Sequence, residues 1–148
     1  MASSRLSSTI SNNWNRSYLL NIPMIDNQHE RFFFLFDSLS EMILQVEKKD
    51  HLYEIIDELE KYSHYHFLAE ETLMRDAHVV DSEIKAHELQ HKVFIKKVEE
   101  FQIASRYNNA VLSEQMLQFM RKWFLMHIKV TDTKYVDAIK SYLKSKSE

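Results

Sequence analysis

The chain contains no glycine and only one proline among its 148 residues. Glycine adopts the positive φ angles of tight turns more readily than any other residue, and proline pre-sets the φ angle that many other turns require. A fold with many tight turns would therefore lack the residues that its turns normally use. The composition favours long helices joined by few loops.

Length, charge and hydrophobicity restrict the class of protein. With 45% hydrophobic residues the chain can bury a sizeable core, and its length predicts a single domain over residues 1–148. The formal net charge of −3 gives no general reason to bind nucleic acid or an anionic membrane surface. No apolar run has the length of a signal peptide core or a membrane span. We expect a cytoplasmic protein with no nucleic-acid or membrane partner.

Apolar residues recur at alternating steps of three and four in four segments, which is the spacing of one face of a helix. We expect helices after Asp26, Asp50 and Asp81, and a fourth that opens near Asn108 and Asn109. The expected inward faces comprise, in chain order, Ile25, His29, Phe32, Phe36, Leu39, Ile43 and Val46; Leu52, Ile56, Leu59, Ser63, His66, Glu70 and Leu73; Ile84, His87, His91, Phe94, Val98 and Phe101; and Leu112, Met116, Phe119, Trp123, His127 and Val130.

Four helices joined by short loops predict an all-α fold, an antiparallel up-down four-helix bundle. Residues 26–132 would form the bundle core. An N-terminal arm would occupy residues 1–25, and a short C-terminal helix and tail would occupy residues 133–148.

Polar residues interrupt each of the four apolar faces. Burying an unpaired carboxylate costs several kcal/mol, against a total stability of about 5–15 kcal/mol for a small domain. In an up-down bundle the start of the first and third helices and the end of the second and fourth lie together, so these residues fall within a slab roughly 15 Å deep. We expect them to converge on one centre, formed by His29, His66, Glu70, His87, His91 and His127.

The spacing of these residues is that of metal ligands on a helix. The pairs His66/Glu70 and His87/His91 are each four residues apart, so both members project from adjacent turns of one face. The chain has no cysteine, which excludes disulfides, thiolate metal sites and iron–sulfur clusters. Histidine combined with carboxylate suits iron, zinc or manganese rather than calcium.

Asp132 fits this set only with a local distortion. It follows His127 by five residues, which is about 140° round an ideal helix. Both side chains can face inward if the helix ends or takes a π-type bulge between them, and we predict such a distortion there.

The segments "IDNQHERFF", "HFLAEETLM", "HELQH" and "WFLMHIKVTD" resemble the ligand-bearing segments of hemerythrins, particularly of the single-domain bacterial kind. The resemblance covers roughly residues 14–135. It implies two iron ions, Fe²⁺ or Fe³⁺ with an oxo or hydroxo bridge, that bind dioxygen reversibly for transport, storage or delivery. It further implies that His87, His91 and His127 ligate one iron, that His29 and His66 ligate the other, and that Glu70 and Asp132 bridge the two.

This ligand set implies where dioxygen binds. Two octahedral irons with these ligands and a shared bridge have one open position, on the iron held by His29 and His66. The residue after Trp123 is commonly aliphatic in hemerythrins and is Phe124 here, so the oxygen pocket is expected to be narrower or differently shaped. The aromatic residues expected to line this pocket are Phe32, Phe67, Trp123 and Phe124.

Several functions stay open beside reversible oxygen binding. Di-iron oxidases and ferritins use four glutamates, whereas two carboxylates here favour binding over oxidation of a substrate, and we expect no enzyme. The alternatives are an oxygen sensor, a di-iron enzyme handling peroxide or nitric oxide, and an interaction module without metal. An unidentified oxygen-accepting or redox partner is also open. The remaining histidines, His51, His64 and His78, are expected to face solvent.

Overall fold

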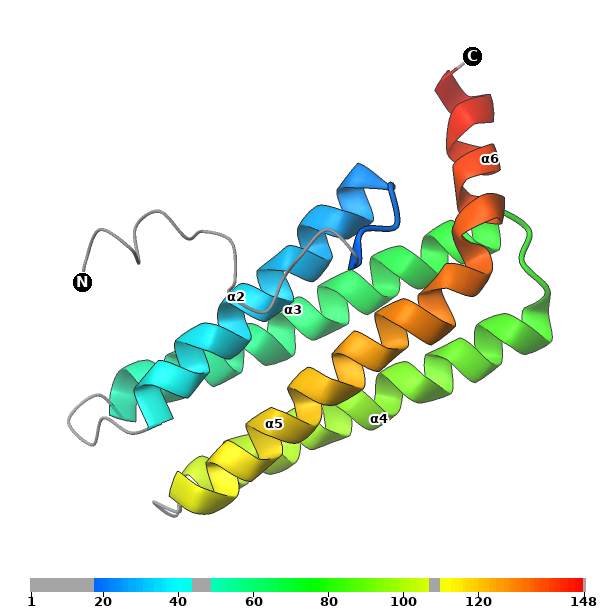
Figure 1. Cartoon of the computed structure of the whole chain (residues 1–148). Coiled ribbons are helices and arrows are strands. Elements are labelled where there is room, and N and C mark those ends of the chain that lie inside the picture. Colours follow the sequence, from blue (N-terminus) through cyan, green and yellow to red (C-terminus); the bar gives the residue numbers. More distant parts are fainter. Residues whose placement is uncertain (1–17, 44–48, 107–109, 148) are drawn as a thin grey trace, which may run out of the picture.

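The computed structural model describes residues 18–43, 49–106 and 110–147 and contains only helical elements within them (Figure 1). The elements α2 to α5 are long α-helices, η3 is a π-helix, η4 is a 3₁₀-helix and α6 is a short α-helix. In chain order they are α2 (Pro23–Ile43), α3 (Lys49–Asp76), α4 (Asp81–Ser105), α5 (Ala110–Met126), η3 (His127–Thr131), η4 (Asp132–Tyr135) and α6 (Val136–Ser147).

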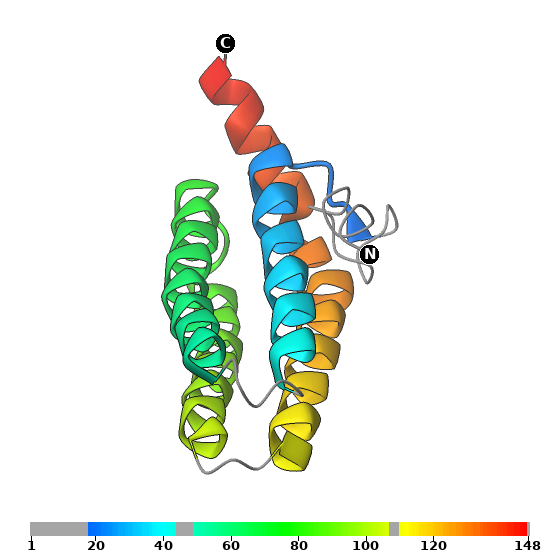
Figure 2. The same cartoon turned by 90° about the vertical axis from the view of Figure 1, so that its left-hand side faces the viewer.

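Helices α2 to α5 lie side by side as a four-helix bundle, and α6 extends beyond one end of it (Figures 1 and 2). Each helix packs on the next in the chain, and α5 also packs on α2, which closes the bundle. The predicted all-α four-helix bundle is confirmed. Within the described residues no helix is both long enough and apolar enough to cross a membrane.

Helix α2 begins at Pro23, so the prediction that it follows Asp26 is wrong. Proline suits the first helical position because its fixed φ is helical and its missing N–H would have no partner there. Asp26 instead lies in the first turn and folds back, where its carboxylate accepts hydrogen bonds from the backbone N–H groups of Leu20 at 2.8 Å and Ile22 at 3.1 Å. This contact fixes the direction in which the chain enters the bundle.

The turn between α3 and α4 shows how a glycine-free chain ends a helix. His78 has φ 62°, and its N–H donates to the carbonyl of Arg75 while the N–H of Val79 donates to that of Met74. This pattern is the Schellman motif, whose left-handed position is usually glycine. Asn21 is the only other described residue with positive φ, so the helical bundle makes few demands for glycine.

The inward faces predicted for the first three helices are confirmed wherever their side chains are described, since all of them are buried; Val46 lies outside the described residues. The face predicted for the fourth helix is partly wrong, because Phe119 is 45% exposed and Val130 is 51% exposed. The side chain of Leu112 lies outside the described residues. Two adjacent apolar stripes share His127, and periodicity alone cannot choose between them. The stripe that faces the core consists of Leu117, Met120, Phe124, His127 and Ile128.

We predict that His78→Gly raises the free energy of unfolding by about 0.5–1 kcal/mol, because a residue with a Cβ is strained at positive φ. Urea denaturation of the full chain measures this change. The control is His64→Gly, at an exposed position inside α3, which should lower the free energy of unfolding by about 0.5 kcal/mol. Changes of the same sign in both variants would contradict the account of the turn.

Candidate metal centre

The seven residues expected to bind metal meet between the helices, near the end of the bundle from which α6 departs. All are side chains that ordinarily prefer water, yet none is more than 5% exposed. Helix α2 supplies one of them, α3 two, α4 two, and the η3–η4 segment two. They are His29, His66, Glu70, His87, His91, His127 and Asp132.

A π-helix brings Asp132 to the same face as His127. Residues His127–Thr131 form the π-helix, and the N–H of Asp132 donates to the carbonyl of His127, five residues earlier. The wider turn aligns residues five apart, which an α-helix separates by about 140°. The predicted distortion is therefore confirmed. Like many π-bulges, it lies at a cluster of polar side chains buried in the core.

Three of the histidines form one compact group. The Nε2 atom of His127 lies 3.2 Å from Nε2 of His91 and 3.1 Å from Nε2 of His87. Oε1 of Glu70 is 2.7 Å from Nε2 of His87 and 3.1 Å from Nε2 of His91. Oδ1 of Asp132 is 3.1 Å from the Nε2 atoms of both His87 and His127. We call His87, His91 and His127 the three-histidine group.

His29 and His66 form a second group on the other side of the same carboxylates. Oε2 of Glu70 lies 3.7 Å from Nε2 of His29 and 3.6 Å from Nε2 of His66. Oδ2 of Asp132 lies 3.4 Å from Nε2 of His29. We call this pair the two-histidine group. Each carboxylate thus turns one oxygen toward each group.

The chemistry of these atoms fits bound cations. Nε2 of His66 is buried and has no hydrogen-bond partner among the described residues. Both oxygens of Asp132 are buried without an aligned hydrogen bond, although histidine nitrogens lie 3.1 to 3.4 Å from them. Leaving such atoms unpaired is costly, and coordination to a metal would satisfy them. Two sets of side chains could each hold a metal ion, because the ligand atoms within each set all lie within 4.8 Å of one another. The sets are Glu70 with His87, His91 and His127, and Glu70 with His29 and His66. Imidazole and carboxylate donors suit iron, so the cluster fits a di-iron site.

Hydrogen bonds from neighbouring helices orient three of the histidines. In each case Nδ1 lies next to a side-chain oxygen, so Nδ1 carries the proton and Nε2 is left to face the centre. The bonds join His66 Nδ1 to Gln28 Oε1 at 2.7 Å, His91 Nδ1 to Glu71 Oε2 at 2.7 Å, and His127 Nδ1 to Gln90 Oε1 at 3.0 Å.

Sequence reasoning missed these three supporting residues. Each stands directly beside a ligand in the chain but supports a ligand on the next helix. Gln28 of α2 supports α3, Glu71 of α3 supports α4, and Gln90 of α4 supports the histidine that follows α5. The only signal in the sequence was that each of these three polar residues stands next to a predicted ligand. Which ligand it supports depends on how the helices cross.

Burial and charge push the histidine pKa values in opposite directions. Burial lowers the pKa of His66 to about 3, and the nearby Glu70 only partly offsets this. Burial also acts to lower the pKa of His127, but the carboxylates of Asp132 and Glu70 outweigh it and raise that pKa to about 10. The same carboxylates raise the pKa of His87. Hydrogen bonds from the surrounding histidines hold the pKa of Glu70 well below its usual range despite burial.

Aromatic rings surround the two-histidine group. The ring centre of Phe124 lies 5.5 Å from that of His29, and the ring centre of Phe32 lies 5.2 Å from that of His66. Phe32 and Phe124 are 4.2 Å apart and fully buried. These two residues of the expected oxygen pocket therefore form an apolar wall beside the two-histidine group.

The other two aromatic residues expected in the pocket contact the three-histidine group. Trp123 lies parallel to His127, with ring centres 4.7 Å apart and planes 9° apart. Phe67 stacks on His91 at 3.9 Å and also lies 5.5 Å from the ring of His66. Phe67 thus reaches both groups, whereas Trp123 lies beside the three-histidine group.

The remaining histidines lie apart from this cluster. His64 and His78 are exposed, as predicted. The side chain of His51 lies outside the described residues.

Comparison with known proteins supports the resemblance drawn from the ligand-bearing segments. A family model described as Hemerythrin HHE cation binding domain matches residues 20–139. A Bacteriohemerythrin of Clostridium acetobutylicum is 34% identical over 128 residues, covering 84% of this chain and 98% of that protein. A Bacteriohemerythrin of Pseudomonas aeruginosa is 33% identical over 141 residues, covering 91% and 88%. One of Stenotrophomonas maltophilia is 29% identical over 130 residues, covering 88% and 82%.

We predict that Gln28→Leu and Gln90→Leu each lower the affinity of the chain for Fe²⁺ by about 10–100-fold, because each removes the acceptor that orients a ligand. Anaerobic titration of the iron-free chain measures this affinity. Gln102→Leu is the control, since Gln102 bonds to Asp57 and Glu60. Unchanged affinity in both test variants would show that the bonds do not orient the ligands.

We predict that iron binding at pH 7 releases about one to two protons per chain, because ligand imidazoles must be neutral. Without metal His127 is protonated at this pH, since its pKa is raised to about 10, and the pKa of His87 is also raised. His66, whose pKa is lowered to about 3, has no proton to lose. Apparent affinity should therefore rise with pH up to about 10.

Calorimetric titrations in two buffers of different ionisation enthalpy at the same pH measure the released protons. Release should fall toward zero above the raised pKa of His127. Absence of any release at pH 7 would contradict the charge assignment.

Proposed function

We propose, because the chain belongs to the hemerythrin family, that its buried cluster holds two iron ions and binds dioxygen reversibly. The proposal rests on the position of two carboxylates, since Glu70 and Asp132 each lie between the two histidine groups. One carboxylate oxygen faces each group, so two cations could share both side chains. The unequal histidine numbers would leave one cation with fewer protein ligands.

In this proposal each residue has a defined place. When bound, the irons supply the redox chemistry by which dioxygen is taken up and given back. Gln28 keeps Nε2 of His66 directed at the centre. The three-histidine group would hold one iron, the two-histidine group would hold the other and take up dioxygen beside it, and Glu70 and Asp132 would bridge the two.

The walls of the two-histidine group favour reversible binding. Phe32 and Phe124 are fully buried and exclude water from this side. A dry, apolar environment hinders proton delivery and the escape of charged products, both of which would make oxidation irreversible. Phe124 occupies space that a smaller aliphatic side chain would leave open, which supports a narrow oxygen pocket.

Tyr62 is the hydroxyl-bearing side chain packed against this wall, with its ring 4.9 Å from that of Phe32. Its hydroxyl donates to the backbone carbonyl of Gln28 at 3.0 Å. Burial raises the pKa of Tyr62, which makes it a poor acid. Tyr62 is therefore not a ready proton donor to the two-histidine group.

We predict that the reduced, iron-loaded chain gains near-ultraviolet and visible absorption bands on exposure to air and loses them when oxygen is removed. Optical spectra through repeated cycles, with iron content measured on the same sample, test this. Immediate and irreversible oxidation, with consumption of added peroxide, would instead identify an enzyme.

Variants of α3 connect this spectrum to the proposed ligands. Glu70→Ala should abolish the oxygen-dependent bands because it removes a bridge between the irons. His64→Ala changes an exposed residue of the same helix and should retain them. An unchanged spectrum in Glu70→Ala would remove the bridging role.

A further inference from the structure

A groove of about 380 Å³ lies between α4 and α5, directly outside the three-histidine group. Phe119, Met126 and Val130 form its apolar walls, and each of them is about half exposed. Gln90, Trp123 and His127 also line it. The groove therefore reaches from solvent to a residue of the proposed iron site.

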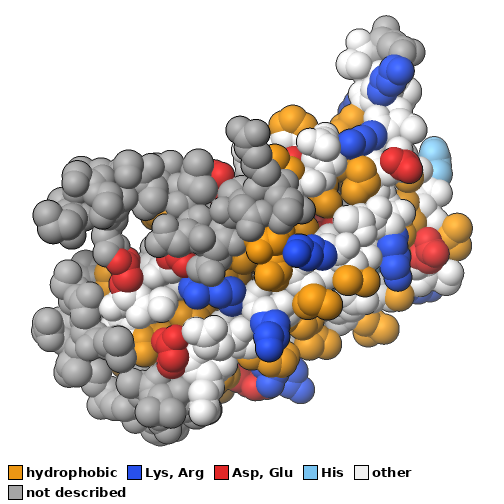
Figure 3. Space-filling view, in the orientation of Figure 1, with side chains coloured by type: hydrophobic (Ala, Val, Ile, Leu, Met, Phe, Trp, Pro, Cys, Tyr) orange, Lys and Arg blue, Asp and Glu red, His pale blue; other side chains and the backbone are white. Residues whose placement is uncertain are grey.

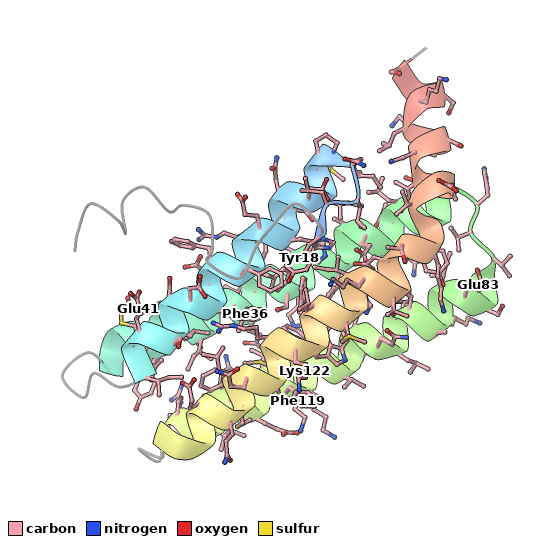
Figure 4. All side chains as sticks on the ribbon, in the orientation of Figure 1. Tyr18, Phe36, Glu41, Glu83, Phe119 and Lys122 are labelled. Atoms are coloured by element: carbon pink, nitrogen blue, oxygen red, sulfur yellow. The ribbon has the colours of Figure 1, made fainter. Side chains whose placement is uncertain are left out.

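The surface around this groove is cationic as well as apolar. No Asp or Glu occurs from residue 115 to residue 131, although the whole chain has a net charge of −3. Lys122 lines the groove. Lys129 is exposed and follows in the same segment, but it does not line the groove, and its Nζ lies 4.9 Å from the ring centre of Tyr18. Phe119 and Lys122 both extend from α5 (Figure 4). Hydrophobic and basic side chains lie next to one another along this face of the bundle (Figure 3).

The acidic side chains at the borders of this face are already paired. Asp37 of α2 lies 3.1 Å from Arg121, and Glu100 of α4 lies 3.3 Å from Lys97. Lys97 in turn places its Nζ 5.1 Å from the ring centre of Phe119. Among the described residues that line the groove, Lys122 is the only lysine, arginine or carboxylate, so its charge is the one that the groove itself presents to a partner.

One aromatic side chain connects the groove to the centre. The indole of Trp123 lies parallel to the imidazole of His127, and the Nε2 atom of His127 lies 3.1 Å from Oδ1 of Asp132. The two-histidine group lies behind the buried rings of Phe32 and Phe124 instead. A protein bound in the groove would thus approach the iron of the three-histidine group, on the side away from the proposed oxygen pocket.

We propose that this groove docks an acidic one-electron carrier protein that re-reduces the oxidised centre. The proposal rests on the proposed function, because it needs two irons that can become Fe³⁺. Each encounter would transfer one electron, so that the carrier would be oxidised and one Fe³⁺ held by the site would be reduced to Fe²⁺. Two encounters restore the diferrous pair, and no bond to the carrier forms or breaks.

An acidic partner suits this surface better than a second copy of the chain. A two-fold contact through α5 would bring Lys122 and Lys129 against the same cationic face of the other copy, which like-charge repulsion disfavours. Acidic side chains of a carrier would pair with the lysines, while its apolar contacts would bury Phe119 and Met126. Methionine and aromatic side chains are enriched in such interfaces.

The binding test uses a plant-type [2Fe–2S] ferredoxin, a small acidic electron carrier, as the probe. Calorimetry measures the affinity of the oxidised ferredoxin for the full chain with its metal bound, and for Lys122→Glu/Lys129→Glu prepared in the same way. The double variant should bind at least about tenfold more weakly and lose most of the salt dependence. The control Lys61→Glu/Lys92→Glu makes the same charge change at exposed positions of α3 and α4, outside the α5–η3 segment, and should change the affinity by no more than about twofold.

The kinetic test follows reduction of the oxidised, iron-loaded chain by reduced ferredoxin in a stopped-flow instrument without oxygen. The second-order rate constant should fall in Lys122→Glu/Lys129→Glu by the same factor as the affinity. Reduction by dithionite, which needs no docking, should remain within about twofold of the wild-type rate.

Three results would overturn the proposal. They are no binding of ferredoxin by the wild-type chain, an equal loss of ferredoxin affinity in Lys61→Glu/Lys92→Glu, and a rate constant of reduction that does not fall with the ferredoxin affinity. Concentration-dependent dimers that Lys122→Glu/Lys129→Glu abolishes would assign the groove to a second copy and also overturn it. Reversible oxygen binding is measured separately, so a failure of the proposed function would leave the affinity result readable.

Discussion

One buried carboxylate, that of Glu70, lies at the centre of the fold. Glu70 projects from α3 into the space where all four helices meet, and its oxygens contact histidines from α2, α3, α4 and the segment after α5. A charge buried this deeply destabilises a protein unless it is compensated, and the histidine nitrogens compensate it fully only if they are protonated or share a cation with it. A metal bound at this site would therefore stabilise the bundle, and the packing of the four helices depends on how the charge of Glu70 is compensated.

The same carboxylate divides the site into two unequal sides. On one side His29 and His66 face a wall of buried phenylalanine rings, which keeps water away. On the other side His127 lies under Trp123 at the floor of a surface groove. A small apolar ligand suits the first side, and an electron-carrying partner suits the second. In our proposals dioxygen would use the first side and the electron carrier the second, so the two would not compete for one entrance.

The sequence was sufficient to predict the bundle and the residues gathered at its centre, because buried positions of a straight helix recur every three to four residues. His127 and Asp132 break that period, and their spacing of five predicted the π-helix that the structure contains. Where two apolar stripes shared His127, local pattern could not choose between them, and Phe119 proved to be exposed. The partnerships of Gln28, Glu71 and Gln90 were also beyond prediction, since they depend on how neighbouring helices cross.

The central claim is that Glu70 and Asp132 bridge two irons, and X-ray absorption spectroscopy at the iron edge of the loaded chain tests it most directly. The account predicts about two irons per chain and a scattering contribution from a second iron within about 4 Å. This contribution should disappear in Glu70→Ala. Full iron loading with no iron–iron contribution would mean that the two histidine groups bind iron independently, and would contradict the bridging role on which the proposed function rests.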